Sequence, residues 1–256
     1  MFHQIITYIK WFPKTFHLHG IHSPFVFSFQ KKCLKNKSKK DSDQIVRAYR
    51  EALLQNDQTI SVTDFGAGSR VFSSNERKVK DIARYAGASL KRMQSIQRIV
   101  QYFKPKNILE IGTSLGMGTI AFASSADAQV ISLEGCPETA AIAKKQLHDF
   151  HVSNVDIIVG EFSESIKELP KKKYDLIYFD GNHSKEATLQ YAQDLVSTIT
   201  NETIWIFDDI HWSSEMTEAW RMIQEIPEVT ATIDSFWLGC VFFRKEQNKE
   251  HFYVSI

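Results

Sequence analysis

The stretch LEIGTSLGMGT, residues 109–119, decides the fold of this 256-residue chain. A short apolar run ends there in three closely spaced glycines, which let a backbone turn tightly and approach a ligand after a strand. The next apolar run, QVISLE, ends in Glu134, 22 residues after the first of these glycines, Gly112. An acid at that distance can accept hydrogen bonds from both ribose hydroxyls of a bound cofactor. The stretch therefore predicts a cofactor site between a strand and a helix.

Apolar runs alternate with amphipathic helical patterns around this stretch. We expect strands at 107–112, 129–134, 155–160, 174–180 and 202–209, and helices at 89–103, 118–125, 137–150, 163–169, 184–199 and 213–226. Continuous apolar strands joined by helices form a parallel sheet that is covered on both faces. Two further strands, 229–234 and 236–243, are too close for a crossover helix, so we expect an antiparallel hairpin at one edge. The sequence therefore predicts an α/β, Rossmann-like fold.

The first third of the chain differs from the rest. Helical patterns cover 43–54 and about 78–85, and composition and periodicity change near Ser89, so we expect an N-terminal helical cap at 1–88 and the main domain at 89–256. Residues 1–90 hold 15 Lys and Arg against 7 Asp and Glu, although the whole chain is +1. This excess indicates either an anionic partner or a solvated basic face.

Composition argues against disulfide-rich, zinc-binding, secreted and membrane-spanning classes of protein. The chain is 43% hydrophobic and 24% charged, as in globular proteins. Its three cysteines are too scattered for a disulfide framework or a zinc site and fit a cytoplasmic location. Lysines interrupt the aromatic start, which argues against a signal peptide, and no apolar run approaches the 18 residues of a membrane span. His17, His19 and His22 could form a metal cluster, but packing or substrate contacts explain them as well.

A second glycine stretch, TDFGAGSR at 63–70, contains Asp64, Gly66 and Gly68. No clear helix follows it, and no strand ends in an acid about 20 residues later. It is therefore interpreted as a tight loop, with a nucleotide site as the alternative.

The E-x-G-x-x-x-G spacing at 110–116 is not the dinucleotide fingerprint, which needs G-x-G-x-x-G. With the closing hairpin, it resembles the class I S-adenosylmethionine-dependent methyltransferases over residues 89–256. The resemblance implies a seven-stranded sheet whose last strand is antiparallel. It also implies that S-adenosylmethionine binds at these positions: Glu110, Gly112, Thr113, Ser114, Gly116, Gly118, Glu134, Gly135, Glu161, Phe162 and Asp180.

Three carboxylates follow two neighbouring predicted strands. Asp180 ends one strand, and Asp208 and Asp209 end the next. Because the carboxyl ends of parallel strands meet at one edge of a sheet, we expect these acids to converge. Close carboxylates repel one another unless they are protonated or neutralised, and a hard divalent cation such as Mg²⁺, Mn²⁺ or Ca²⁺ would neutralise them.

The spacing of these acids, 28 and 29 residues, resembles that of the metal-dependent O-methyltransferases of the catechol and caffeoyl-CoA type. That family has Asp-Asn where this chain has Asp208-Asp209, a pair that resembles the macrocin-type sugar O-methyltransferases. The alternative is that the pair only caps the helix that follows.

His183 lies three residues after Asp180, where the catechol-type relatives hold a catalytic lysine. Histidine titrates near neutrality and could accept the substrate proton, with Asp180 also in a catalytic role; it could instead bind metal or begin a helix. His211 could contact substrate or belong to a loop, and Trp212 could form an apolar wall.

Together these features predict a methyltransferase that transfers CH₃ to an oxygen of a small molecule with adjacent oxygens, assisted by a divalent metal, with a homodimer compatible with the sequence. Two alternatives stay open. One is a metal-independent methyltransferase acting on RNA or another anionic substrate, which the basic first third favours. The other is a regulatory module that binds S-adenosylmethionine without turnover.

Overall fold

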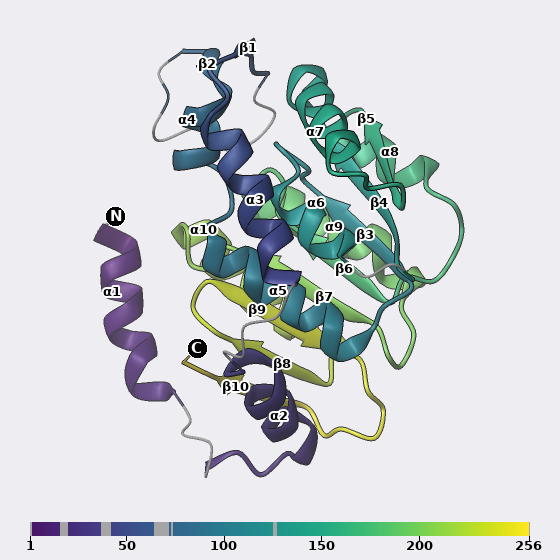
Figure 1. The fold of residues 1–256 in the computed structure, drawn as a ribbon. Helices are drawn as coiled ribbons and strands as arrows, with labels where there is room; N and C mark the ends of the chain where they lie inside the picture. Colours follow the sequence, from purple (N-terminus) through teal and green to yellow (C-terminus); the bar gives the residue numbers. More distant parts are fainter. Residues whose placement is uncertain are drawn as a thin grey trace. The chain divides into compact units, whose positions relative to one another are not determined.

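The computed structural model describes residues 2–15, 20–36, 42–63, 72, 74–124 and 127–255 (Figure 1). The chain divides into two compact units, the first formed by residues 1–36 with 169–256 and the second by residues 37–168. The cap predicted at 1–88 and the domain predicted at 89–256 follow a different boundary and stay predictions.

The second unit contains the glycine stretch. Its main strands, β3 (Asn107–Ile111), β4 (Gln129–Glu134) and β5 (Val155–Val159), are parallel and adjacent in that order. The strands β1 (Thr59–Ser61) and β2 (Glu76–Lys78) form a separate antiparallel pair. The helices are α3 (Ser42–Leu54), α4 (Val79–Tyr85), α5 (Leu90–Phe103), α6 (Met117–Ala123), α7 (Pro137–Asp149) and α8 (Phe162–Glu168).

The first unit contains the acidic residues. Its strands lie in the order β10 (Glu250–Tyr253), β8 (Ala231–Asp234), β9 (Leu238–Phe242), β7 (Ile204–Asp208) and β6 (Leu176–Phe179). Its helical segments are α1 (Phe2–Trp11), η1 (Phe12–Lys14), α2 (Pro24–Phe29), η3 (Gln30–Leu34), α9 (Lys185–Leu195), η4 (Val196–Thr198) and α10 (Ser214–Gln224).

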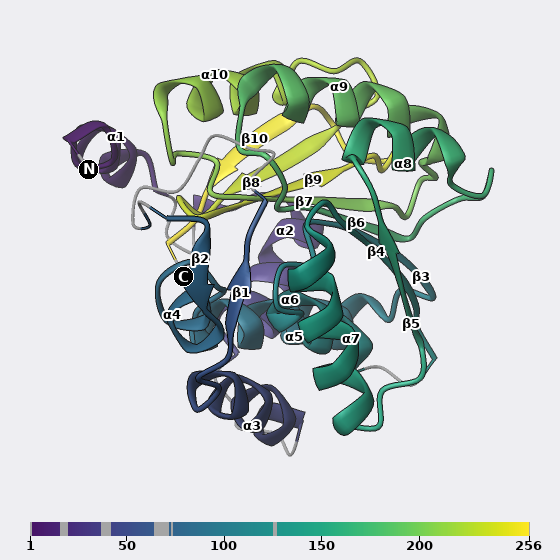
Figure 2. The ribbon, with the colours of Figure 1, turned by 90° about the horizontal axis from the view of Figure 1, so that it is seen from above.

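Helices cover both faces of the strands in the first unit. In Figure 2, α9 and α10 lie over one face and α2 lies on the other. The side chains explain this arrangement, because Trp220 of α10 packs on Gly239 of β9, and Phe25 of α2 contacts Phe242 of the same strand edge to face. The strands β7, β8 and β9 are fully buried between these layers, as the continuous apolar runs predict.

The α/β fold predicted from the sequence is confirmed, with two corrections. The described residues of the two units contribute eight main strands rather than seven, because β10 pairs parallel to β8. The predicted antiparallel hairpin is β8–β9, but it does not form the edge, since β9 lies between β7 and β8 and β10 lies beyond them. The sequence EHFY of β10 has too little apolar pattern to predict a strand.

Among the described residues, no helix has both the length and the apolar character needed to cross a membrane.

Candidate cofactor site and acidic cluster

The turn after β3 is the glycine-dependent part of the second unit. Gly112 has φ 105°, a region that glycine enters at little cost and other residues rarely adopt. The backbone N–H groups of Gly112 and Thr113 donate to the Leu133 carbonyl at 2.9 and 3.0 Å, which ties the turn to the end of β4. The turn therefore places the backbone of Gly112 and Thr113 beside the end of β4, where Glu134 lies.

Gly116 is required for a different reason. It has φ 76° at the start of α6, and a Cβ at this position would come within 2.5 Å of the Tyr49 hydroxyl. That hydroxyl donates to the Leu115 carbonyl at 2.9 Å, so Tyr49 of α3 supports the loop directly. Burial, followed by the charge of Glu110, holds the pKa of Tyr49 well above its usual range. Gly118, in contrast, lies inside α6 and has no positive φ.

Glu134 ends β4 as a buried carboxylate that orders the surrounding loops. Its Oε2 accepts from the Ser114 N–H at 2.6 Å, and its Oε1 accepts from the Cys136 N–H at 2.9 Å and the Thr139 hydroxyl at 3.1 Å. Burial raises the pKa of Glu134, although these donors and the Gly135 amide oppose the effect. A carboxylate held by loop amides beside a glycine turn fits the ribose of S-adenosylmethionine, whose hydroxyls would share its oxygens.

Three further predicted cofactor residues, Glu110, Glu161 and Phe162, lie in the second unit. Glu110 is buried, and its Oε2 accepts from the Thr119 and Ser132 hydroxyls at 2.6 Å each. Glu161 is exposed and accepts from the Ser163 hydroxyl and, at 3.2 Å, from the Glu164 N–H at the start of α8, where Phe162 is buried. Their contacts to a cofactor stay predictions.

The acidic residues of the first unit follow adjacent strands. β6 and β7 are parallel and pair Phe179 with Phe207, so Asp180 and Asp208 stand at neighbouring strand ends. Asp208 is buried, whereas Asp180 and Asp209 are half-buried. Three residues in the segments after β6 and β7 have left-handed backbone conformations, which cost energy in residues other than glycine. They are Asn182 (φ 67°), His183 (φ 49°) and Asp209 (φ 50°). Such outliers concentrate at functional sites.

His183 is the cation of this cluster. Its Nε2 lies 3.4 Å from Oδ1 of Asp180. Burial lowers the pKa of His183, but the hydrogen bond and charge of Asp180, with the charges of Asp209 and Asp208, outweigh it and bring the pKa to about 9. At pH 7 His183 is therefore protonated, which differs from the expectation of a histidine that titrates near neutrality.

Within the ranges that the structure describes, no group of three or more His, Cys, Asp and Glu side chains is arranged to hold a metal ion. Asp180, Asp208 and Asp209 are therefore not set out as a coordination site in this arrangement, and the His183 imidazolium supplies positive charge beside them. The divalent cation stays a prediction from the sequence.

The titration of His183 tests this cluster. We expect the ring protons of His183 to shift with a midpoint near pH 9 in the intact protein, and to titrate about 1 pH unit or more lower in Asp180→Asn because a major source of stabilising charge is lost. NMR of selectively labelled histidine measures this. Because the pKa of His183 is higher in the folded protein, its protonation adds to the free energy of unfolding. This contribution is complete below pH 6.5 and is lost as the pH rises through 9. An unchanged midpoint in Asp180→Asn would contradict the assigned pair.

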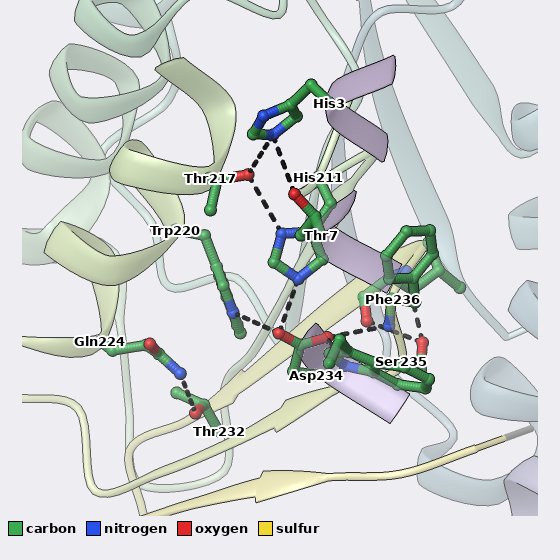
Figure 3. Close-up of polar contacts among 12 residues, drawn as sticks. His3, Thr7, His211, Thr217, Trp220, Gln224, Thr232, Asp234, Ser235 and Phe236 are labelled. Atoms are coloured by element: carbon green, nitrogen blue, oxygen red, sulfur yellow. Dashed lines mark hydrogen bonds and ion pairs between the residues drawn. The ribbon is translucent and has the colours of Figure 1, made fainter. Parts of the chain in front are cut away.

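A buried network around Asp234 was not predicted from the sequence (Figure 3). Asp234, at the end of β8, accepts from Nε2 of His211 at 2.9 Å and from Nε1 of Trp220 at 3.2 Å. Nδ1 of His211 lies 3.2 Å from the Thr217 hydroxyl, which lies 3.1 Å from Nε2 of His3. The sequence did not decide whether His211 contacts substrate or belongs to a loop. In the structure His211 is buried and is linked to α10 by Thr217 and, through Thr217, to His3 of α1.

Two other sequence features lie outside the described residues: His17 and His19, and the glycine stretch from Asp64 to Arg70. His22 is exposed, and within the described residues it belongs to no group of His, Cys, Asp and Glu side chains that could hold a metal ion.

A parallel sheet with an inserted antiparallel strand, a glycine turn after β3 and an acid ending β4 define the class I S-adenosylmethionine-dependent methyltransferase fold. The comparisons with known proteins agree. Residues 109–210 match the family described as "Methyltransferase domain". This part of the chain is therefore similar to the methyltransferase domain family, and the fold resembles that of solved O-methyltransferases.

Three solved structures illustrate the likeness. The Podospora anserina methyltransferase PaMTH1, bound to S-adenosylhomocysteine, is 16% identical, with 88% of this chain and 97% of that chain covered and a TM-score of 0.60. The Bacillus cereus O-methyltransferase in complex with S-adenosylhomocysteine is 18% identical (83% and 96%; TM-score 0.55). The Streptomyces achromogenes O-methyltransferase TomG, involved in tomaymycin synthesis and bound to S-adenosylmethionine, is 12% identical (86% and 95%; TM-score 0.57). At these identities the likeness shows the fold.

Curated relatives match over a shorter region. The protein-L-isoaspartate O-methyltransferase of Pyrococcus horikoshii is 34% identical over 90 residues, 35% of this chain and 40% of that protein. Its counterpart from Pyrococcus abyssi is 35% identical over 71 residues, 28% of this chain and 32% of that protein. The chain thus spans less than half the length of the curated relatives that it matches.

Proposed function

We propose that the chain is an S-adenosylmethionine-dependent O-methyltransferase acting on a small molecule with adjacent oxygens. The observation that carries the proposal is the pairing of the Gly112 turn with the buried Glu134 carboxylate at the end of β4. The fold shared with the O-methyltransferases of Bacillus cereus and Streptomyces achromogenes supports it.

Bound S-adenosylmethionine supplies an electrophilic methyl group on a sulfonium. The protein therefore has to bind the cofactor, align the acceptor oxygen with the methyl group and remove the acceptor's proton. The second unit provides binding, with Glu134 accepting from the ribose and the Gly112 turn allowing the cofactor to approach the backbone. The acceptor hydroxyl loses its proton to the Asp180 carboxylate, whose charge is balanced by His183, while the oxygen forms a bond to the methyl carbon and the carbon–sulfur bond breaks. The products are a methyl ether, S-adenosylhomocysteine and one proton.

An acceptor-library screen with labelled S-adenosylmethionine tests the proposal. We expect label on the oxygen of a small-molecule acceptor, and we expect Asp180→Asn and His183→Ala each to lower kcat by about 100-fold or more. Glu186→Gln, a change at an exposed acid of α9, is the matched control. Binding of S-adenosylmethionine without turnover of any acceptor would favour the regulatory module, and label on RNA would favour the nucleic-acid alternative.

Running the same assay in excess EDTA and in Mg²⁺ tests the metal prediction. Turnover that persists in EDTA would contradict the metal prediction and would leave the imidazole of His183 beside the carboxylates as their only proposed partner. Turnover that disappears in EDTA and returns with Mg²⁺ would instead confirm a divalent cation at Asp180, Asp208 and Asp209.

A further inference from the structure

Helix α1 presents its apolar side outward. Phe2, Ile5, Ile9 and Phe12 recur along one side of the segment and are 78%, 55%, 65% and 53% exposed, and Ile6 and Tyr8 add to the same surface. A surface helix of a globular protein normally turns its apolar side to the core and its polar side to water. This orientation leaves an exposed apolar stripe formed by Phe2, Ile5, Ile6, Ile9 and Phe12, with Tyr8 at its margin packed on Phe236.

Specific hydrogen bonds hold α1 in this orientation, so it is not accidental. Nε1 of Trp11 donates to Oδ1 of the buried Asp234 at 2.7 Å. On the same side of the helix, Nε2 of His3 lies 3.1 Å from the Thr217 hydroxyl and 3.3 Å from that of Thr7, as Figure 3 shows. The ring of Tyr8 also packs edge to face on Phe236 with 5.0 Å between centroids. The polar side of α1 is thus fixed inward, and the stripe is fixed outward.

Lysines accompany the stripe in the sequence. Residues 1–40 contain eight lysines and no Asp or Glu. Lys10 and Lys14, at the end of the stripe, are exposed, as are Lys31, Lys32 and Lys35 of the same unit. An amphipathic helix with apolar and aromatic residues on one side and lysines beside them is suited to the surface of an anionic bilayer.

The size of the stripe favours a bilayer over a second protein. A ten-residue helix is about 15 Å long, so one side of it falls well short of the roughly 800 Å² that each partner contributes to a specific interface. It is also half the length needed to cross a bilayer. We propose that α1 docks the protein on an anionic membrane surface, with the apolar stripe at the boundary between headgroups and acyl chains. The proposal is independent of the proposed function.

Vesicle co-sedimentation of the full chain tests the proposal. We expect binding to phosphatidylglycerol-containing vesicles, weaker binding at high salt and little binding to pure phosphatidylcholine. The double substitution Ile5→Ser with Ile9→Ser should weaken binding by roughly tenfold or more because two exposed apolar side chains no longer enter the bilayer. Lys10→Glu with Lys14→Glu should weaken it on anionic vesicles.

Controls separate docking from misfolding and self-association. Met222→Ser removes an apolar side chain of α10 that is 47% exposed and should leave vesicle binding unchanged. Circular dichroism and the melting temperature should be unaltered in the Ile5/Ile9 variant, since neither side chain is buried. Absence of wild-type binding to anionic vesicles would overturn the proposal. So would a wild-type dimer in analytical ultracentrifugation that the Ile5/Ile9 variant converts to a monomer, because the occupant would then be a second copy.

Discussion

Asp234→Ala is expected to lower the free energy of unfolding by about 3–5 kcal/mol. The carboxylate is 2% exposed and accepts four hydrogen bonds. Its Oδ1 accepts from Nε1 of Trp11 at 2.7 Å and the N–H of Phe236 at 2.9 Å, and its Oδ2 accepts from His211 and Trp220. Removing it leaves buried donors without an acceptor, which costs more than the net worth of the bonds themselves.

Urea denaturation of the full chain measures this effect. Asp234→Asn should be intermediate, because one carboxylate oxygen becomes an NH₂ group that faces donors. Glu228→Ala, a change at an exposed acid of the same unit, should alter the free energy of unfolding by less than about 0.5 kcal/mol. A loss below about 1 kcal/mol for Asp234→Ala would contradict the assigned network.

The Asp234 network also shows what sequence patterns leave out. The strand that ends in Asp234 was predicted, because its apolar run is local. The partners of the carboxylate were not, because Trp11 lies 223 residues away in sequence and periodicity does not specify which side chains meet across a fold. His211 has no sequence feature that separates a buried, bonded histidine from one in an exposed loop.

The acidic residues were easier to place than to interpret. The adjacency of Asp180 and Asp208 follows from the rule that parallel neighbouring strands end at the same edge, and β6 and β7 obey it. The charge balance depends instead on a distance of 3.4 Å between His183 and Asp180, which no spacing in the sequence fixes. The metal ion proposed from the sequence therefore stays a prediction, and the short distance between His183 and Asp180 was not anticipated.

Glu134→Ala is expected to weaken the binding of S-adenosylhomocysteine by about 1–3 kcal/mol, a loss of roughly 5- to 150-fold. Two losses combine. The ribose hydroxyls lose a charged acceptor, and the N–H of Ser114 loses the acceptor that holds the glycine turn in place at 2.6 Å. Glu134→Gln keeps the shape but removes the charge, so it should fall between the wild type and the alanine variant. Glu138→Ala, at the exposed start of α7, should bind as the wild type does.

Isothermal titration of S-adenosylhomocysteine into the wild type, Gly112→Trp and Glu134→Ala tests the central claim most directly. We expect saturable binding of about one ligand per chain in the wild type, no measurable binding in Gly112→Trp, whose φ of 105° and close backbone approach suit only glycine, and the weakening stated above in Glu134→Ala. Absence of binding to the wild type, or equal affinity in all three proteins, would contradict the claim that the Gly112 turn and Glu134 form the cofactor site.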